Sequence, residues 1–359
     1  MNTFLSVHLL QEGGLVSRYE NFVKAMRKII LGMLLMLCAS CMNTSSNTNP
    51  KLSFYYWKTT FSLDEVEKEA LTNLNVSKLY IRYFDIGLKN GTAIPITPIV
   101  FKEAVPLLEV VPVIYIKNEV VLSEQLEVKK LANQIVDFVT QINEHNNIDS
   151  QEIQIDCDWT LNSKERFFAL IDQLHKETEM KISATIRLHQ VKYASKTGIP
   201  NVDRGVLMYY NMGRIASDSL NSIYDREIAQ KYIGGLRDYP LQLDYALPIY
   251  SWVVHSKDNQ VIRLISRLRT ADLAQQPSVK QQQANQFVVT QEMEAFGFVF
   301  QPGDVLKVES ISANQLKEMT IDLYRASGTC PKEIILYDLN SKNINYYDQE
   351  IFKEMVRCK

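Results

Sequence analysis

From residue 52 onward, short apolar segments alternate with longer segments in which apolar residues recur every three or four positions. The short segments are typical of buried strands, and the longer ones are typical of amphipathic helices. We expect strands at residues 52–58, 77–86, 110–116, 152–159, 181–188, 205–211, 241–252 and 333–339. We expect helices at residues 123–145, 163–178, 224–233, 314–327 and 346–356, and another that begins at Ser62. Eight strands that alternate with helices predict an α/β fold of the (β/α)8 TIM-barrel class.

The main alternative for this alternation is an open, doubly wound sheet, which often has a glycine-rich turn after its first strand. This chain has no such glycines there, so we favour a barrel over residues 52–359. Two connections are unusual. The connection at residues 88–108 is irregular and contains prolines. A longer segment, at about residues 256–312, begins Gln-rich and ends in an expected hairpin that turns at residues 301–304, which predicts a small α+β insertion after strand 7.

The first 41 residues have the character of a targeting segment. A short basic region precedes an apolar run at residues 29–37, which is too short to span a membrane. This run and Cys41 resemble a bacterial lipoprotein signal, in which the cysteine carries acyl chains such as palmitate. We therefore expect residues 1–25 to be an upstream extension, residues 42–51 to be a tether, and Cys41 to anchor the chain in the bacterial periplasm or outer membrane. A plain secretory signal is the alternative.

Composition and charge narrow the choice of partners. The chain has 359 residues, is 46% apolar and carries a net charge of −2, which is ordinary for a globular protein. Without a basic surplus, we expect no nucleic-acid partner. No Cys/His spacing is typical of zinc, and there is no Gly-rich phosphate loop, so we expect neither a metal nor a cofactor. Cys330 and Cys358 would both lie at the bottom of a barrel, where an exported protein could form a disulfide between them.

Two aspartates on one expected strand are the strongest candidates for chemistry. Side chains alternate between the faces of a strand, so Asp156 and Asp158 share the face opposite Ile155 and Cys157. Burying two carboxylates on one face of a strand costs free energy. That cost is usually tolerated at a functional site, where neighbouring acids can shift each other's pKa. We therefore take both as candidate catalytic residues. The alternative is that the pair is neutralised by a cation, for which Arg187 on the next strand is suitable.

Three segments at the ends of expected strands carry motifs. They read Ile153-Gln154-Ile155-Asp156-Cys157-Asp158-Trp159-Thr160, Met208-Tyr209-Tyr210-Asn211 and Leu247-Pro248-Ile249-Tyr250-Ser251. These segments resemble family 18 glycoside hydrolases, the chitinases and endo-β-N-acetylglucosaminidases, whose strands end in Asp-Gly-x-Asp-x-Asp-Trp-Glu, Met-x-Tyr-Asp and Leu-Pro-x-Tyr-Gly. The first Asp and the Gly of the first motif are absent here, where Ile153 and Gln154 stand. An α+β insertion after strand 7 is also frequent in that family. The resemblance covers residues 153–340 and implies a divergent relative with a glycan ligand, whose N-acetyl group Asp156, Asp158 and Tyr210 could hold.

Other polar and aromatic residues fall at or near expected strand ends, where barrels bind their ligands. The candidate substrate-binding residues are Trp57, Asp85, Trp159, Tyr210, Asn211, Tyr250, Trp252 and Tyr337. Further carboxylates that could reach the same cleft are Asp304, Glu309 and Asp338. Aromatic rings would stack on sugar faces, although strand aromatics also serve as ordinary packing in the core.

The chain departs from the family at the residue that matters most for catalysis. Thr160 stands where the family has its catalytic glutamate, and a hydroxyl is too weak an acid to protonate a leaving group. Asn211 also replaces an acidic residue. We expect a glycoside-hydrolase-like lipoprotein that acts on or binds a glycan containing N-acetylhexosamine. As a hydrolase it would need a relocated acid, for which Asp158 beside Asp156 is the best candidate. The alternatives are a non-catalytic carbohydrate-binding barrel and a structural or assembly lipoprotein.

Overall fold

The computed structural model describes Met26 and residues 49–358 of the chain. Apart from Met26, the expected signal segment lies outside these residues, as do most of the tether and the lipidation site Cys41. No helix within the described part is long and apolar enough to cross a membrane.

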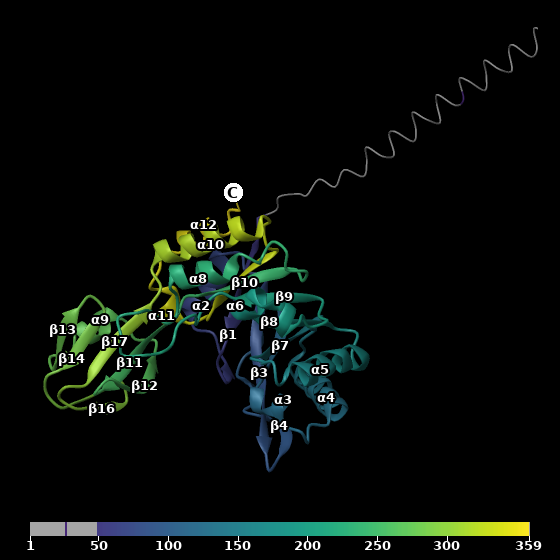
Figure 1. The fold of residues 1–359 in the computed structure, drawn as a ribbon, viewed down its shortest axis with the longest axis horizontal. Coiled ribbons are helices and arrows are strands. Elements are labelled where there is room, and N and C mark those ends of the chain that lie inside the picture. Colours follow the sequence, from purple (N-terminus) through teal and green to yellow (C-terminus); the bar gives the residue numbers. More distant parts are fainter. Residues whose placement is uncertain (1–25, 27–48, 359) are drawn as a thin grey trace, which may run out of the picture. The chain divides into compact units, whose positions relative to one another are not determined.

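Eight parallel strands close into a barrel, as the sequence pattern predicts (Figure 1). In barrel order they are β1 (Lys51–Tyr56), β3 (Lys78–Lys89), β6 (Glu109–Ile116), β7 (Glu152–Cys157), β8 (Lys181–Arg187), β9 (Arg204–Met208), β10 (Leu243–Pro248) and β18 (Glu333–Tyr337). Each strand pairs in parallel with the next, and β18 returns to pair with β1. The fold is therefore a (β/α)8 TIM barrel.

Helices follow most of the strands. They are α2 (Glu65–Asn73), α3 (Asn118–Leu122), α4 (Val128–Asn146), α5 (Lys164–Glu177), α6 (Leu188–Lys192), α7 (Ala194–Thr197), α8 (Arg226–Ile233), α10 (Ala313–Ser327), α11 (Ser341–Ile344) and α12 (Glu350–Met355). The first barrel helix begins later than expected, because Asp64, and not Ser62, forms the capping box with Glu67. The last expected helix is also shorter, and α11 precedes it.

The connection between β3 and β6 is built from strands. Through this stretch, all of which is described, there is no helix, and β3 instead forms a hairpin with β4 (Thr92–Ile96). The short strand β5 (Val100–Phe101) pairs with β2 (Thr60–Phe61). This replaces the second helix of a regular barrel and agrees with the irregular pattern expected at residues 88–108.

The insertion after the seventh barrel strand is larger than the sequence suggests. Its five-stranded sheet contains β11 (Ser251–Lys257), β12 (Gln260–Ser266), β13 (Val279–Gln283), β14 (Gln286–Val289) and β17 (Val305–Ser310), with α9 (Thr270–Ala274) beside it. The expected strand at residues 241–252 is therefore two strands, β10 of the barrel and β11 of the insert. The insert has its own apolar core and forms a lobe beside the barrel (Figure 1).

The expected hairpin at the end of the insert is wrong in its pairing. A turn does lie at residues 301–304, where Asp304 accepts a hydrogen bond from the Gln301 N–H at 2.9 Å. However, the strand before it, β16 (Phe298–Phe300), pairs with β15 (Met293–Ala295), whereas β17 pairs with β11 and β14.

A cluster of charges fills the amino-terminal end of the barrel. Arg204, the first residue of β9, donates to Glu152 on β7 at 2.8 Å and to Asp244 on β10 at 2.5 Å. It also lies 3.4 Å from Glu333 on β18, and Glu333 accepts from the Tyr80 hydroxyl at 2.6 Å. One guanidinium thus joins residues of three strands, because its fork of donors can bind several carboxylates at once.

The cysteines are placed as expected from the pattern. Cys330 and Cys358 form a disulfide with a Cα–Cα distance of 6.0 Å. Cys157 is buried on β7 and is the free cysteine of the described residues. The disulfide ties the loop before β18 to the end of the chain after α12.

Candidate functional site

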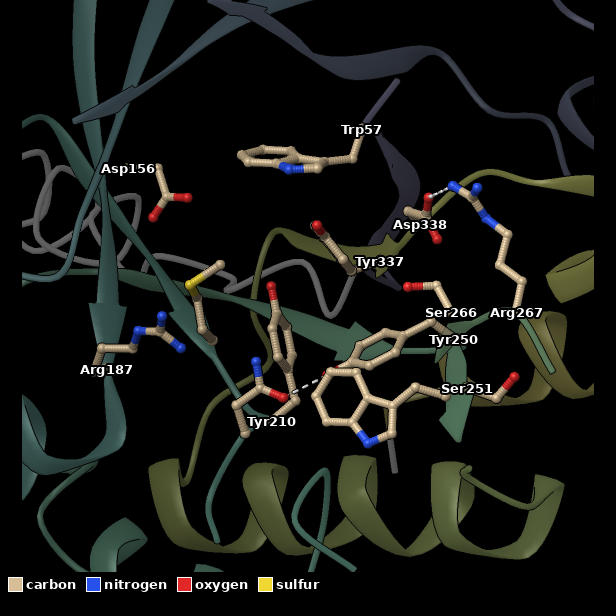
Figure 2. Close-up of a pocket in the computed structure, with 13 residues that line it drawn as sticks. Trp57, Asp156, Arg187, Tyr210, Tyr250, Ser251, Ser266, Arg267, Tyr337 and Asp338 are labelled. Atoms are coloured by element: carbon tan, nitrogen blue, oxygen red, sulfur yellow. Dashed lines mark hydrogen bonds and ion pairs between the residues drawn. The ribbon is translucent and has the colours of Figure 1, made fainter. Parts of the chain in front are cut away.

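A cavity of about 370 Å³ lies at the carboxyl ends of the barrel strands. Such a volume is within the range of small-molecule and sugar-sized binding pockets. The lining residues come from six barrel strands or the loops that follow them, and from the insert: Trp57, Asp156, Arg187, Met208, Tyr210, Asn211, Tyr250, Ser251, Trp252, Ser266, Arg267, Tyr337 and Asp338. Figure 2 shows Asp156 and Arg187 on one side of this cavity and Asp338 and Arg267 on the other.

Asp156 is the acid of β7 that reaches the cavity. It is 6% exposed and accepts a hydrogen bond from the Thr185 hydroxyl at 2.7 Å. Burial raises the pKa of Asp156 from 3.8 to about 6, against the Arg187 guanidinium and the Thr185 hydroxyl, which both lower it. This carboxyl group therefore exchanges its proton close to neutral pH, which suits either hydrogen bonding to a ligand or proton transfer.

Asp158 has a different environment. Both of its oxygens accept hydrogen bonds from the Arg187 guanidinium, the second at 2.7 Å. From the sequence, Arg187 could neutralise the aspartate pair, and in the structure its ion pair is with Asp158. Because this bidentate pair occupies both carboxylate oxygens, Asp156 is the better placed of the two for chemistry in the cavity.

Aromatic rings form much of the cavity wall. Tyr337 at the end of β18 lies 5.6 Å from Trp57, 5.5 Å from Tyr210 and 5.7 Å from Tyr250, measured between ring centroids. Trp252 packs 5.2 Å from Tyr250. Figure 2 shows Trp57 across the cavity from Tyr250. Flat apolar faces on two sides of a polar cavity are suited to the apolar faces of a sugar ring.

The Tyr210 hydroxyl has no hydrogen-bond partner within the described part of the chain, although it is buried. Burial also raises the pKa of Tyr210 well above its ordinary value, so the hydroxyl stays protonated and can donate at neutral pH. An unpaired buried hydroxyl is costly, and its position in the cavity wall makes it available to a ligand.

Hydrogen bonds hold two residues of the cavity wall, Tyr250 and Trp252, in place. Asn211 has a left-handed backbone, with φ of 55°, and accepts a hydrogen bond from the Tyr250 hydroxyl at 2.5 Å. Trp252 donates from its indole N–H to the buried Glu309 at 2.8 Å, and Glu309 lies directly opposite Trp252 on β17. Glu309 therefore positions a wall and does not line the cavity.

No protein-family model and no curated protein matches the sequence, whereas solved structures match the fold. A chitinase from Bacteroides thetaiotaomicron aligns with a TM-score of 0.54 and 11% identity, over 87% of this chain and 98% of that one. A family 18 chitinase from Cycas revoluta, in complex with (GlcNAc)3, aligns with a TM-score of 0.50 and 9% identity, over 85% and 99%. The chain has the chitinase fold.

Six of the eight expected substrate-binding residues line the cavity: Trp57, Tyr210, Asn211, Tyr250, Trp252 and Tyr337. Two expected residues lie elsewhere. Trp159 is 2% exposed and stacks on Phe167 at 4.7 Å, so it belongs to the packing between barrel and helix. Asp85 forms an ion pair with Arg82 at 2.8 Å within the long strand β3.

Thr160, which the sequence resemblance aligns with the family's catalytic glutamate, is not among the residues that line the cavity. Its hydroxyl lies 3.3 Å from that of Ser163, whose own hydroxyl donates to Asn118 at 2.7 Å. This side chain therefore takes part in the turn that leads into α5.

The cavity is also lined by residues that were not expected to contact a ligand: Met208 and Ser251, which belong to the motifs, and Ser266 and Arg267 of the insert. Arg267, the residue after β12, reaches Asp338 at 3.2 Å, and Asp338 also accepts from Asn343 at 2.7 Å. Of the three further carboxylates considered, Asp338 alone lines the cavity, since Asp304 pairs with His255 inside the insert. No cluster of three or more potential metal ligands occurs among the described residues.

Proposed function

We propose that this protein binds a glycan in the cavity at the carboxyl end of the barrel, and that it does so without cleaving it. The observation that carries the proposal is the pairing of aromatic walls with polar groups that lack a full set of protein partners. Trp57 and Tyr250 offer ring faces on two sides, and the Tyr210 hydroxyl is free to donate. This combination suits a sugar, which has apolar faces and polar edges.

N-acetylhexosamine is the proposed sugar class. Support comes from the chitinase fold, from a Cycas revoluta chitinase that was solved with (GlcNAc)3, and from Asp156 and Tyr210, which occupy the positions that hold an N-acetyl group in the resemblance to family 18. In this proposal, Asp156 accepts from the amide N–H of the sugar and Tyr210 donates to its carbonyl oxygen.

Binding without cleavage is favoured by the surroundings of Thr160 and Asp158. Thr160 is bonded to Ser163 outside the cavity wall, and the Asp158 carboxylate is held by Arg187. A glycosidase needs one carboxyl group to donate a proton to the leaving oxygen and a second group to form or stabilise the new bond. Neither residue can serve as that donor in this arrangement.

Hydrolysis is the second candidate, because Asp156 has a pKa of about 6 in the cavity. A carboxyl group with that pKa is partly protonated near neutral pH and could act as a general acid. Hydrolysis would then require Asp156 to give up its role in holding the N-acetyl group.

One experiment separates these functions. Purified protein is titrated with chitotetraose by isothermal calorimetry, and the same mixtures are analysed for shorter products by mass spectrometry. Tyr210→Phe should weaken binding about fivefold, because one hydrogen bond contributes about 1 kcal/mol. Tyr193→Phe is the control, since Tyr193 is exposed and lies outside the cavity. Binding without products supports the proposal, whereas products that Asp156→Asn abolishes would establish hydrolysis.

We further propose that the protein is a lipoprotein of the bacterial cell envelope, with Cys41 as its acylated residue. The proposal rests on the apolar run and the cysteine that follows it. Labelling of the expressed chain with radioactive palmitate should be lost in Cys41→Ser and retained in Cys157→Ser. Equal labelling of both variants would exclude Cys41 as the anchor.

A further inference from the structure

A second hollow, of about 730 Å³, adjoins the glycan cavity. The two share Ser251 and Arg267 in their linings, so they lie next to each other. The walls of the second hollow come from the start of the insert and from the loop and helix around α11. Its other residues include Arg269, Asp272, Lys342 and Tyr346. This hollow therefore lies where a further part of a ligand longer than one sugar could be held.

The charge of this second hollow is positive. Arg267, Arg269 and Lys342 line it, with Asp272 as the one carboxylate of the lining. The Asp272 carboxylate accepts a hydrogen bond from the Arg269 backbone N–H at 2.7 Å. Arg267 forms an ion pair with Asp338. Within the described residues, neither Arg269 nor Lys342 has a carboxylate at ion-pair distance.

Arg269 is held in place but not neutralised. Its guanidinium carbon lies 3.5 Å from the centre of the Tyr346 ring, and Nη2 donates to the Ile249 carbonyl at 2.9 Å. Its Nη1 is buried and has no hydrogen-bond partner among the described residues. Burying part of a guanidinium without a counter-ion costs free energy. An anion that accepts hydrogen bonds from its unpaired N–H groups would offset that cost.

We propose that the glycan continues from the cavity into this second hollow and carries an anionic group there, a carboxylate or a sulfate, bound by Arg269 and Lys342. This inference rests on the proposed glycan binding and adds the class of glycan: an acidic oligosaccharide with at least two sugar units. Since Nη2 of Arg269 already donates to the Ile249 carbonyl, either anion would accept hydrogen bonds from the remaining N–H groups of this guanidinium.

The test compares matched oligosaccharides on the full-length protein by calorimetry. Chitotetraose is neutral, 6-O-sulfated chitotetraose adds sulfate to the same chain, and a hyaluronan tetrasaccharide carries carboxylates. At least one charged ligand should bind about tenfold tighter than chitotetraose, as expected for a charge-assisted hydrogen bond. That advantage should shrink as NaCl is raised, because screening weakens the ionic contribution. The sulfate and carboxylate ligands together identify which anion is preferred.

Two charge-matched variants complete the test. Lys342→Gln should weaken the charged ligand about fivefold and leave chitotetraose unchanged. Lys280→Gln removes the same charge from an exposed residue of the insert that lies outside the hollow, and should change neither. Equal affinities for neutral and charged ligands, or equal effects of the two variants, would overturn the inference and leave the proposed glycan binding intact. Failure of every ligand to bind would overturn both.

Discussion

Replacing Asp156 with asparagine should make the stability of the protein depend less on pH. The side chain is 6% exposed, and its pKa in the folded chain is about 6, compared with an ordinary value of 3.8. The folded state therefore binds this proton more tightly than the unfolded state does. It follows that Asp156 favours folding fully below about pH 3.8 and that this contribution is lost as the pH rises through about 6.

The size of the effect follows from the two pKa values. The difference between 3.8 and about 6 corresponds to about 3 kcal/mol in the free energy of unfolding, since one pKa unit is about 1.4 kcal/mol. Asparagine has nearly the same shape, can still accept from Thr185, and does not ionise. Relative to the wild type, Asp156→Asn should therefore gain about 2 to 3 kcal/mol between pH 4 and pH 8.

Urea unfolding at several pH values measures this difference directly. Other buried acids, such as Asp244 and Asp338, whose pKa values burial also raises, titrate in both proteins and cancel in the comparison. Asp137→Asn, on the exposed face of α4, is the control and should follow the wild type at every pH. Parallel curves for the wild type and Asp156→Asn would refute the argument that burial holds this pKa near neutrality.

Three further predictions concern other parts of the molecule. Arg204→Ala should lower the free energy of unfolding by about 3 to 5 kcal/mol, because it leaves the buried Glu152 and Asp244 without a cation among the described residues and Glu333 with Lys78 alone; a loss below about 1 kcal/mol in urea unfolding would contradict this. Replacing Cys330 and Cys358 by serine opens a loop closed across 28 residues and should cost about 3 to 4 kcal/mol; unfolding with and without reductant checks the same value. Trp57→Ala should weaken chitotetraose binding about tenfold through loss of ring stacking, and unchanged calorimetric affinity would exclude Trp57 from the site.

The barrel could be predicted from the sequence because its strands are short apolar runs between helices of clear periodicity. Strand ends were harder to predict. The apolar run from β10 continues into β11 with a break of two residues, Ile249 and Tyr250, and both strands are buried. The apolar pattern of a sequence does not show that the second strand belongs to another sheet, so Trp252 was assigned to the barrel. It lies in the insert and still lines the cavity.

The site was predicted in part for similar reasons. Strand alternation assigned Asp156 to the inner face, and the same rule assigns Trp159 to the face of Ile155 and Cys157, where the structure has it packed on Phe167. Asp85 was expected at a strand end, but β3 continues to Lys89 and into a hairpin. Arg267 could not have been predicted, because its place in the cavity depends on how the insert folds back on the barrel.

The short junction between β10 and β11 links occupancy of the cavity to the local stability of the insert. The Ile249 N–H donates to the Tyr337 carbonyl at 2.8 Å, and the next residue, Tyr250, is part of the cavity wall. In the proposed complex, a glycan that contacts both Trp57 of the barrel and Trp252 of the insert would bind only when both surfaces are in place, and would therefore raise the free energy needed for the insert to open locally. Slower proteolysis and slower amide exchange within β11 and β12 would thus accompany ligand binding. These two rates in the insert would therefore report whether the cavity of the barrel is occupied.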